Sequence, residues 1–198
     1  MWNERYKAEH YIYGTEPNDF LAAHIDCIPA GGRVLCLADG EGRNGVFLAR
    51  RGFQVTSVDL SEVGLDKARR LADSHGVSLT LVHADLADFP LGVNAWEGIV
   101  SIFCHLPSAI RAPLYASLPA SLTPEGVFLL EAYSPAQLPR DTGGPKDPDM
   151  LLTADTLRRE LPGLDFSLLR QTERSVVEGT HHTGIGAVVQ AIGTRRAD

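Results

Sequence analysis

The sequence lacks the features of membrane, secreted and metal-binding proteins. Charged and polar side chains interrupt every stretch of about 20 residues, the length that a membrane-spanning helix needs. Residues 1–7 are polar and contain no apolar signal-peptide segment. The three cysteines, Cys27, Cys36 and Cys104, form no Cys-x-x-Cys pair, which favours neither a disulfide framework nor a zinc site. We therefore expect a cytoplasmic protein without a membrane partner.

Basic residues are also in the minority. The 18 Lys and Arg against 25 Asp and Glu give a formal net charge of −7. A nucleic-acid-binding domain usually carries a basic face, so we do not expect RNA or DNA as a partner. The chain has no internal repeat, and 198 residues with 44% hydrophobic side chains suffice for one core. We expect residues 1–198 to form a single domain, whose oligomeric state the sequence leaves open.

Apolar runs alternate with helical segments through most of the chain. Strands are expected at residues 33–37, 54–58, 78–83, 96–103 and 126–133. Helices are expected at residues 20–28 and 42–51, from the N-cap Ser61 to residue 75, from the N-cap Ser108 to about residue 122, and from the N-cap Thr153 to residue 161. This alternation predicts βαβ units and a parallel sheet.

The end of the chain follows another pattern. Two strand-like runs, 164–177 and 186–193, flank a polar turn and predict an antiparallel hairpin. The expected fold is therefore α/β, a Rossmann-like, doubly wound and mostly parallel seven-stranded sheet that ends in a β-hairpin. Residues 1–30 form an N-terminal cap. The loop 134–152 is longer than a connection needs and is a candidate active-site lid.

A glycine-rich turn follows the first expected strand. Gly40, Gly42 and Gly45 satisfy the pattern G-x-G-x-x-G between a strand and a helix, where small residues let a ligand approach the backbone. A purely structural turn has the same signature. Asp59 ends the second strand, where an acid is placed to accept hydrogen bonds from ribose hydroxyls. Asp85 follows the third strand and either receives an adenine amino group or starts a helical turn.

These motifs in this order resemble the class I S-adenosylmethionine (SAM)-dependent methyltransferases, and the resemblance covers nearly the whole chain. Within that class, the sequence looks most like the tellurite-resistance methyltransferase group. The segments that carry this likeness are Trp2…Arg5-Tyr6 with Tyr13-Gly14…Pro17-Asn18, Gly40-Glu41-Gly42-Arg43-Asn44, and His105-Leu106-Pro107. The resemblance implies SAM as the cofactor.

Two positions depart from the usual acid-x-Gly-x-Gly-x-Gly pattern of the class. Cys36 stands where the acid is expected, and Ala38 replaces the first glycine. Asp39 is a candidate substitute for the missing acid near the methionine amine. We assign the cofactor to a group of residues on the strand ends and the glycine loop: Ala38, Asp39, Gly40, Gly42, Asn44, Asp59, Leu60, Asp85, Leu86 and Phe103.

Candidate catalytic residues lie beyond the fourth strand and in the hairpin. His105 is a general base, a residue that orients the acceptor, or a histidine bonded to nearby backbone. Arg174 either attracts an anionic acceptor or is a solvated strand residue. His181 and His182 are neighbours in a strand and point to opposite faces, so we expect no metal site there.

The expected activity is methyl transfer from SAM to a small molecule or small anion. The run Ser101-Ile102-Phe103-Cys104 replaces the Asn/Asp-Pro-Pro-aromatic motif of DNA amino-methyltransferases, which further disfavours nucleic acid. Two alternatives stay open. One is a SAM- or S-adenosylhomocysteine (SAH)-binding protein without turnover. The other is an NAD(P)-binding oxidoreductase, although little chain is left for a second βαβαβ half.

Overall fold

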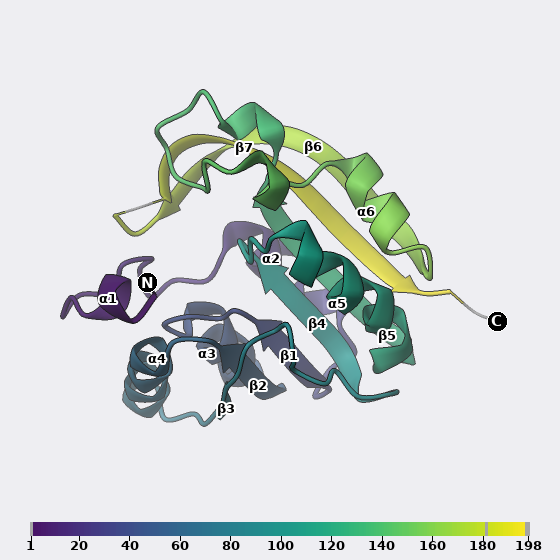
Figure 1. Cartoon of the computed structure of the whole chain (residues 1–198). Helices are drawn as coiled ribbons and strands as arrows, with labels where there is room; N and C mark the ends of the chain where they lie inside the picture. The colour runs from purple at the N-terminus through teal and green to yellow at the C-terminus, as the bar shows by residue number, and fades with distance from the viewer. Residues whose placement is uncertain (1, 181, 197–198) are drawn as a thin grey trace.

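The computed structural model describes residues 2–180 and 182–196, and its centre is one seven-stranded sheet. Figure 1 shows how the helices lie around this sheet. The strand order is β3-β2-β1-β4-β5-β7-β6. The strands span β1 Arg33–Leu37, β2 Gln54–Asp59, β3 Thr80–His83, β4 Trp96–Ile102, β5 Leu122–Tyr133, β6 Leu164–Glu178 and β7 His182–Arg195. The first five strands are parallel, and β7 pairs antiparallel with both β5 and β6. The predicted fold class, with its terminal hairpin, is confirmed.

Helices cover both faces of the sheet. They are α1 Trp2–Tyr6, α2 Asp19–His24, α3 Arg43–Arg50, α4 Glu62–Ser74, α5 Ser108–Ser121 and α6 Ala154–Glu160, with short 3-10 turns η1 Ile25–Cys27, η2 Pro135–Gln137 and η3 Pro148–Met150. Side chains alternate along a strand, so β1 serves two cores. Leu35 and Leu37 pack with α5 and α6, whereas Val34 and Cys36 pack with α2 and α3. No helix in the described ranges has the length and apolar character to cross a membrane.

Most expected elements are present, with shifted ends. Strand β5 begins four residues earlier than predicted, and β7 begins at His182 rather than at residue 186. Ser61 and Thr153 cap α4 and α6 as expected, because their hydroxyls accept from Gly64 N and Thr156 N. The prediction for Ser108 was wrong. Pro107 holds the N-cap position of α5, and the backbone N–H of Ser108 donates to Asp149 Oδ2 at 2.7 Å.

Candidate cofactor and acceptor site

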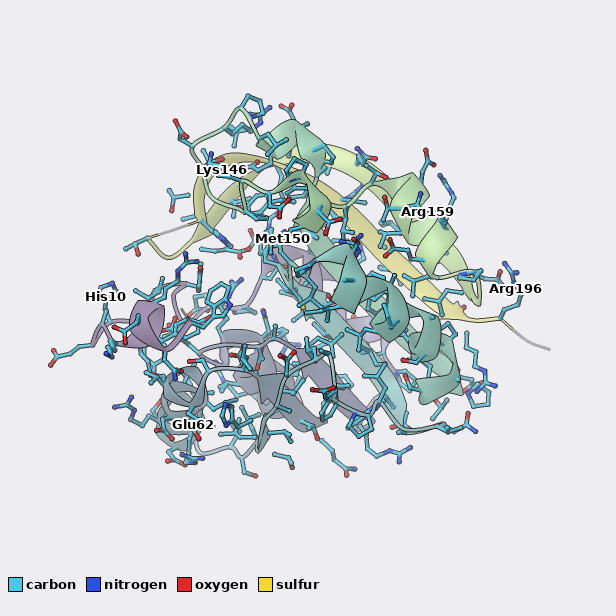
Figure 2. The ribbon with its side chains drawn as sticks, viewed as in Figure 1. His10, Glu62, Lys146, Met150, Arg159 and Arg196 are labelled. Carbon is cyan, nitrogen blue, oxygen red and sulfur yellow. The ribbon has the colours of Figure 1, made fainter. Side chains whose placement is uncertain are left out.

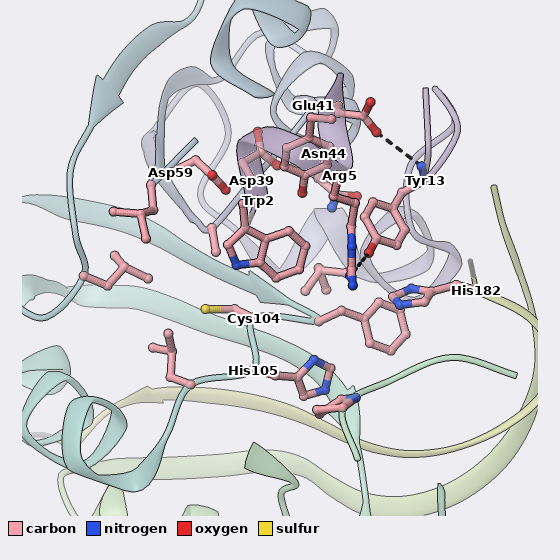
Figure 3. A pocket seen from close by; sticks show the side chains of 18 of the residues that line it. Trp2, Arg5, Tyr13, Asp39, Glu41, Asn44, Asp59, Cys104, His105 and His182 are labelled. Atoms are coloured by element: carbon pink, nitrogen blue, oxygen red, sulfur yellow. Dashed lines mark hydrogen bonds between the residues drawn. The ribbon is translucent and has the colours of Figure 1, made fainter. Parts of the chain in front are cut away.

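A cavity of about 490 Å³ lies at the carboxyl ends of β1, β2, β3 and β4 (Figure 3). This is where open α/β sheets bind ligands, and the volume suits a small organic molecule. Its walls come from the N-terminal cap, the glycine loop, the strand ends and the loop after β5: Trp2, Arg5, Tyr6, Tyr13, Ala38, Asp39, Glu41, Arg43, Asn44, Asp59, Leu60, Ala84, Asp85, Leu86, Ile102, Phe103, Cys104, His105, Leu106, Gly143, Gly144, Pro145, Met150 and His182.

Eight of the ten predicted cofactor residues line this cavity. They are Ala38, Asp39, Asn44, Asp59, Leu60, Asp85, Leu86 and Phe103. The sheet brings together acids that lie far apart in the sequence, because parallel strands end at one edge. Whether these side chains bind a cofactor stays a prediction.

Gly40 and Gly42 are not among the lining residues, so their assignment to the cofactor stays a prediction. A Cβ atom on Gly40 would lie 2.5 Å from Tyr6 Oη, and one on Gly42 would lie 2.5 Å from Ala68 Cβ. Both glycines have positive φ, at 58° and 85°. Because these glycines carry no side chain, Tyr6 of the cap and Ala68 of α4 can pack directly against the backbone of the loop.

Asp59 is buried and already bonded to the backbone. Its Oδ2 accepts from Gly40 N and its Oδ1 from Ser61 N, both at 2.8 Å. Burial raises the pKa of its carboxyl above the usual value. Each carboxylate oxygen has more than one acceptor position, so both remain able to accept a ligand hydroxyl. Asp59 therefore both fixes the glycine loop and faces the cavity.

Asp39 stands near the position of the acid that the family pattern lacks here. Its Oδ2 accepts from Ser57 Oγ at 2.6 Å and from Gly45 N at 3.2 Å. Burial raises the pKa of its carboxyl to about 7. Cys36 itself is buried in the apolar core and does not reach the cavity. Asp39 therefore brings a carboxyl group to the cavity wall after β1, which Cys36 does not.

Two residues that line the cavity have a strained backbone, one after β1 and one after β4. Ala38, after β1, and Phe103, after β4, both have φ of 50°, a left-handed conformation that costs a non-glycine residue on the order of 1–3 kcal/mol. Ala38 thus keeps the turn that glycine usually makes at this position. Such strain is typical of sites where the backbone is held for function.

His105 lines the cavity but is not placed as a general base. Its Nε2 accepts from Tyr133 N at 3.0 Å. Burial, with a contribution from His182, lowers the pKa of its imidazole to about 3. The lone pair that would take a proton is therefore already used by the backbone. The structure supports the alternative weighed from the sequence, a histidine bonded to nearby backbone.

Arg174 does not reach the cavity, which corrects the prediction that it meets the acceptor. Its guanidinium donates to Glu131 and to Glu178, both almost fully buried. Glu178 also pairs with Arg43, and Asn18 Nδ2 donates to Glu131 and Glu178 at 2.7 and 2.8 Å. Two cations and two anions thus form one buried network that joins the hairpin to α3 and the N-terminal cap.

The sequence interpretation missed several lining residues. Arg5 and Glu41 come from the cap and the glycine loop, and no periodicity in the sequence links these segments. His182 was weighed only as a metal ligand together with His181, which lies outside the described residues. In the structure His182 packs on Tyr13 and Phe103, with ring centroids 4.7 and 4.8 Å apart.

Comparisons with known proteins match part of the chain to methyltransferases. Residues 34–126 match the sequence model of a methyltransferase domain family. The putative methyltransferase YqeM of Bacillus subtilis is 31% identical over 112 residues, 54% of this chain and 44% of that protein. A 23S rRNA (uracil(747)-C(5))-methyltransferase of Pyrococcus horikoshii is 28% identical over 97 residues, 44% of this chain and 24% of that protein. The chain thus spans less than half the length of these relatives.

Solved structures match over more of the chain. A protein from work on the conversion of a disulfide bond into a thioacetal group during echinomycin biosynthesis superimposes with a TM-score of 0.77 and 19% identity, covering 98% of this chain and 87% of that one. TehB from Haemophilus influenzae gives 0.71 and 17%, with 90% and 62% covered. At these identities the likeness shows the fold.

Proposed function

We propose that this chain, which has the class I SAM-dependent methyltransferase fold, transfers a methyl group from SAM to a small molecule or small anion. One observation carries the proposal. Asp39, Asp59 and Asp85 leave three consecutive strands and line one cavity beside the glycine loop. An acid at each strand end provides separate acceptors for an amine, a ribose and an adenine amino group.

The described residues fit this cofactor. Asp59 retains acceptor positions for ribose hydroxyls, and Leu60 and Leu86 offer apolar surface for a flat base. Asp39 offers a carboxylate to the cationic amine. When bound, SAM supplies an activated methyl group on a sulfonium, so the protein mainly has to align the acceptor and exclude water.

Aromatic rings form another wall of the cavity, which we assign to the acceptor and the transferred methyl group. Phe103, Tyr13 and His182 line it, and Tyr133 packs behind Phe103 with ring centroids 4.6 Å apart. Such a surface excludes water from the transferred methyl and accommodates an organic acceptor. The formal net charge of −7 argues against a long RNA as the acceptor, although curated relatives include RNA methyltransferases.

Thermal melting tests the cofactor. SAM and SAH should raise the melting temperature, whereas NAD and NADP at the same concentrations should not, because only a ligand of the native state stabilises it. A shift with NAD and none with SAM would contradict the proposal.

Labelled SAM then separates an enzyme from a binding protein. Purified protein is incubated with labelled SAM and a panel of small thiols, amines, phenols and chalcogen oxyanions, with bulk RNA as a further acceptor. Label in a small-molecule product supports the proposal. Label in RNA alone contradicts the acceptor class, and SAH binding without turnover on any acceptor favours the sensor alternative.

A further inference from the structure

Arg5 stands out among the charged residues that line the cavity. The guanidinium of the other lining arginine, Arg43, is paired with Glu178, whereas Arg5 makes no ion pair with the described part of the chain. Four acids also line the cavity: Asp39, Glu41, Asp59 and Asp85. Glu41 pairs with Lys67 at 2.5 Å. Arg5 is therefore an exposed cation on the wall of a cavity lined by four acids, and none of the described carboxylates pairs with it.

Two neighbours orient this guanidinium. Its carbon lies 4.7 Å from the ring centroid of Trp2, and its Nη1 donates to Tyr13 Oη at 3.0 Å. Trp2 stacks in turn on Tyr6, with ring centroids 5.8 Å apart. In Figure 3, Trp2 lies between Asp59 and Arg5, and the Arg5 side chain reaches into the cavity beside Tyr13. A guanidinium has five N–H donors, so one bond to Tyr13 leaves donors for a ligand.

We propose that Arg5 binds a carboxylate inside the cavity, with Trp2 and Tyr13 holding its guanidinium in place. This rests on the proposed function for the identity of the ligands. A planar guanidinium matches a carboxylate through two parallel hydrogen bonds, which a lysine cannot reproduce. Two ligands can supply that group: the methionine part of the cofactor, or an acceptor that is itself a carboxylic acid.

Calorimetry with the full chain distinguishes the two sources. SAH carries the amino-acid carboxylate, and 5′-methylthioadenosine keeps the nucleoside and the thioether but lacks it. Benzoate, titrated into free and SAH-saturated protein, is the probe for an acceptor carboxylate. The variants are Arg5→Gln, which removes the charge, and Arg5→Lys, which keeps it. Arg51→Gln is the matched control, because Arg51 is an exposed cation 5.2 Å from the Phe47 ring and does not line the cavity.

A cofactor carboxylate predicts that Arg5→Gln weakens SAH about tenfold or more and 5′-methylthioadenosine less than twofold, with an intermediate loss for Arg5→Lys. An acceptor carboxylate predicts unchanged SAH affinity and loss of benzoate binding. Arg51→Gln should change none of these. Either pattern supports the proposal.

The proposal is wrong if Arg5→Gln changes neither SAH nor benzoate binding. It is also wrong if SAH and 5′-methylthioadenosine weaken equally, since Arg5 would then only hold the aromatic wall. Failure of the wild-type protein to bind either nucleoside would instead contradict the proposed function, and benzoate binding to the free protein would still test Arg5.

Discussion

Asp59 illustrates how one side chain serves both the fold and the site. The sequence places it at the end of a strand, where a purely ligand-binding acid would be tolerant of replacement. The structure shows it buried, with Gly40 N and Ser61 N both donating to it. Removing the whole carboxylate would therefore leave two backbone N–H groups without an acceptor and would destabilise the fold. The loss of ligand binding and the loss of stability therefore have to be measured separately.

Asp59→Asn is the variant that allows this separation. One oxygen stays to accept a backbone N–H, but the charged acceptor for the ribose hydroxyls is lost. We expect SAH and 5′-methylthioadenosine to weaken by a similar factor of about ten or more, because both keep the ribose. The unfolding free energy should fall by about 1–3 kcal/mol. Calorimetry and urea unfolding measure the two, with exposed Asp66→Asn as the control. Unchanged nucleoside affinity would make Asp59 a structural residue only.

His105 predicts a pH dependence of stability. Its pKa is lowered to about 3, so the native state binds fewer protons than the unfolded state between pH 3 and about 6.5. Its contribution therefore lowers the unfolding free energy as the pH falls through this window. His105→Gln can still accept from Tyr133 N but does not titrate, so its stability should fall less steeply with acid.

Urea unfolding at pH 7.5, 6, 5 and 4 checks this sign. His75→Gln serves as the control, because His75 is exposed and its replacement removes one imidazole without touching the cavity. If wild type and His105→Gln lose stability in parallel down to pH 4, the buried neutral imidazole is not responsible for the acid sensitivity.

Among the elements, the loop between β5 and α6 differs most from a simple connection. Its first part is tied to the hairpin: Gln137 is buried, its Oε1 accepts from Ala187 N, and Thr142 Oγ1 donates to Ile185 O, both at 2.9 Å. Gly143 and Gly144 line the cavity. Lys146 lies at the outer part of the loop, where its Nζ donates to Arg140 O at 3.0 Å (Figure 2). Lys146 is therefore not placed to meet a ligand, unlike the glycines.

The lid remains a prediction about the loop 134–152, and residues 143–147 are the part of that loop that tests it. The backbone amides of Gly143, Gly144 and Lys146 donate no hydrogen bond to the described residues, whereas Gln137 anchors the preceding turn. We expect fast hydrogen exchange here in the free protein and slower exchange with SAH, while residues 134–138 stay protected in both states. Exchange measured by mass spectrometry decides it. Equal protection of 143–147 with and without SAH would show a fixed wall.

At the scale of the molecule, the sequence predicts the sheet better than it predicts the site. Strand β1 and the N-caps Ser61 and Thr153 depend on neighbouring residues in the sequence. The structure contains all three at the predicted positions. The prediction that Arg174 meets the acceptor fails because its partners, Glu131 and Glu178, come together only through the pairing of β5, β7 and β6. Arg5 and Glu41 were missed for the same reason, since only folding brings the cap to the glycine loop.

A second buried ion pair, besides the network around Glu131 and Glu178, fastens the first part of that cap to α4. Lys67 on α4 donates to Ala8 O at 2.9 Å and to His10 O at 2.7 Å, and its ammonium pairs with Glu41 at 2.5 Å. Glu41 Oε2 in turn accepts from Tyr13 N at 3.2 Å. The side chains of both ions are at most 3% exposed. The part of the cap that carries Trp2, Arg5 and Tyr13 is thus bonded to an ion pair that water barely reaches.

Lys67→Met should therefore destabilise the whole protein and open the site. Breaking a buried pair from one side leaves Glu41 charged and unpaired, at a cost of about 3–5 kcal/mol. Lys7→Met is the control: its pair with Glu4 is exposed, at 61% and 71%, and its loss should leave the unfolding free energy nearly unchanged. Urea unfolding gives both values, and proteolysis within residues 7–13 together with SAH affinity reports on the cap. The double variant Lys67→Met with Glu41→Gln should recover part of the loss, since no buried charge is then left alone. If Lys67→Met is no more harmful than Lys7→Met, the cap is held by its aromatic packing rather than by this ion pair.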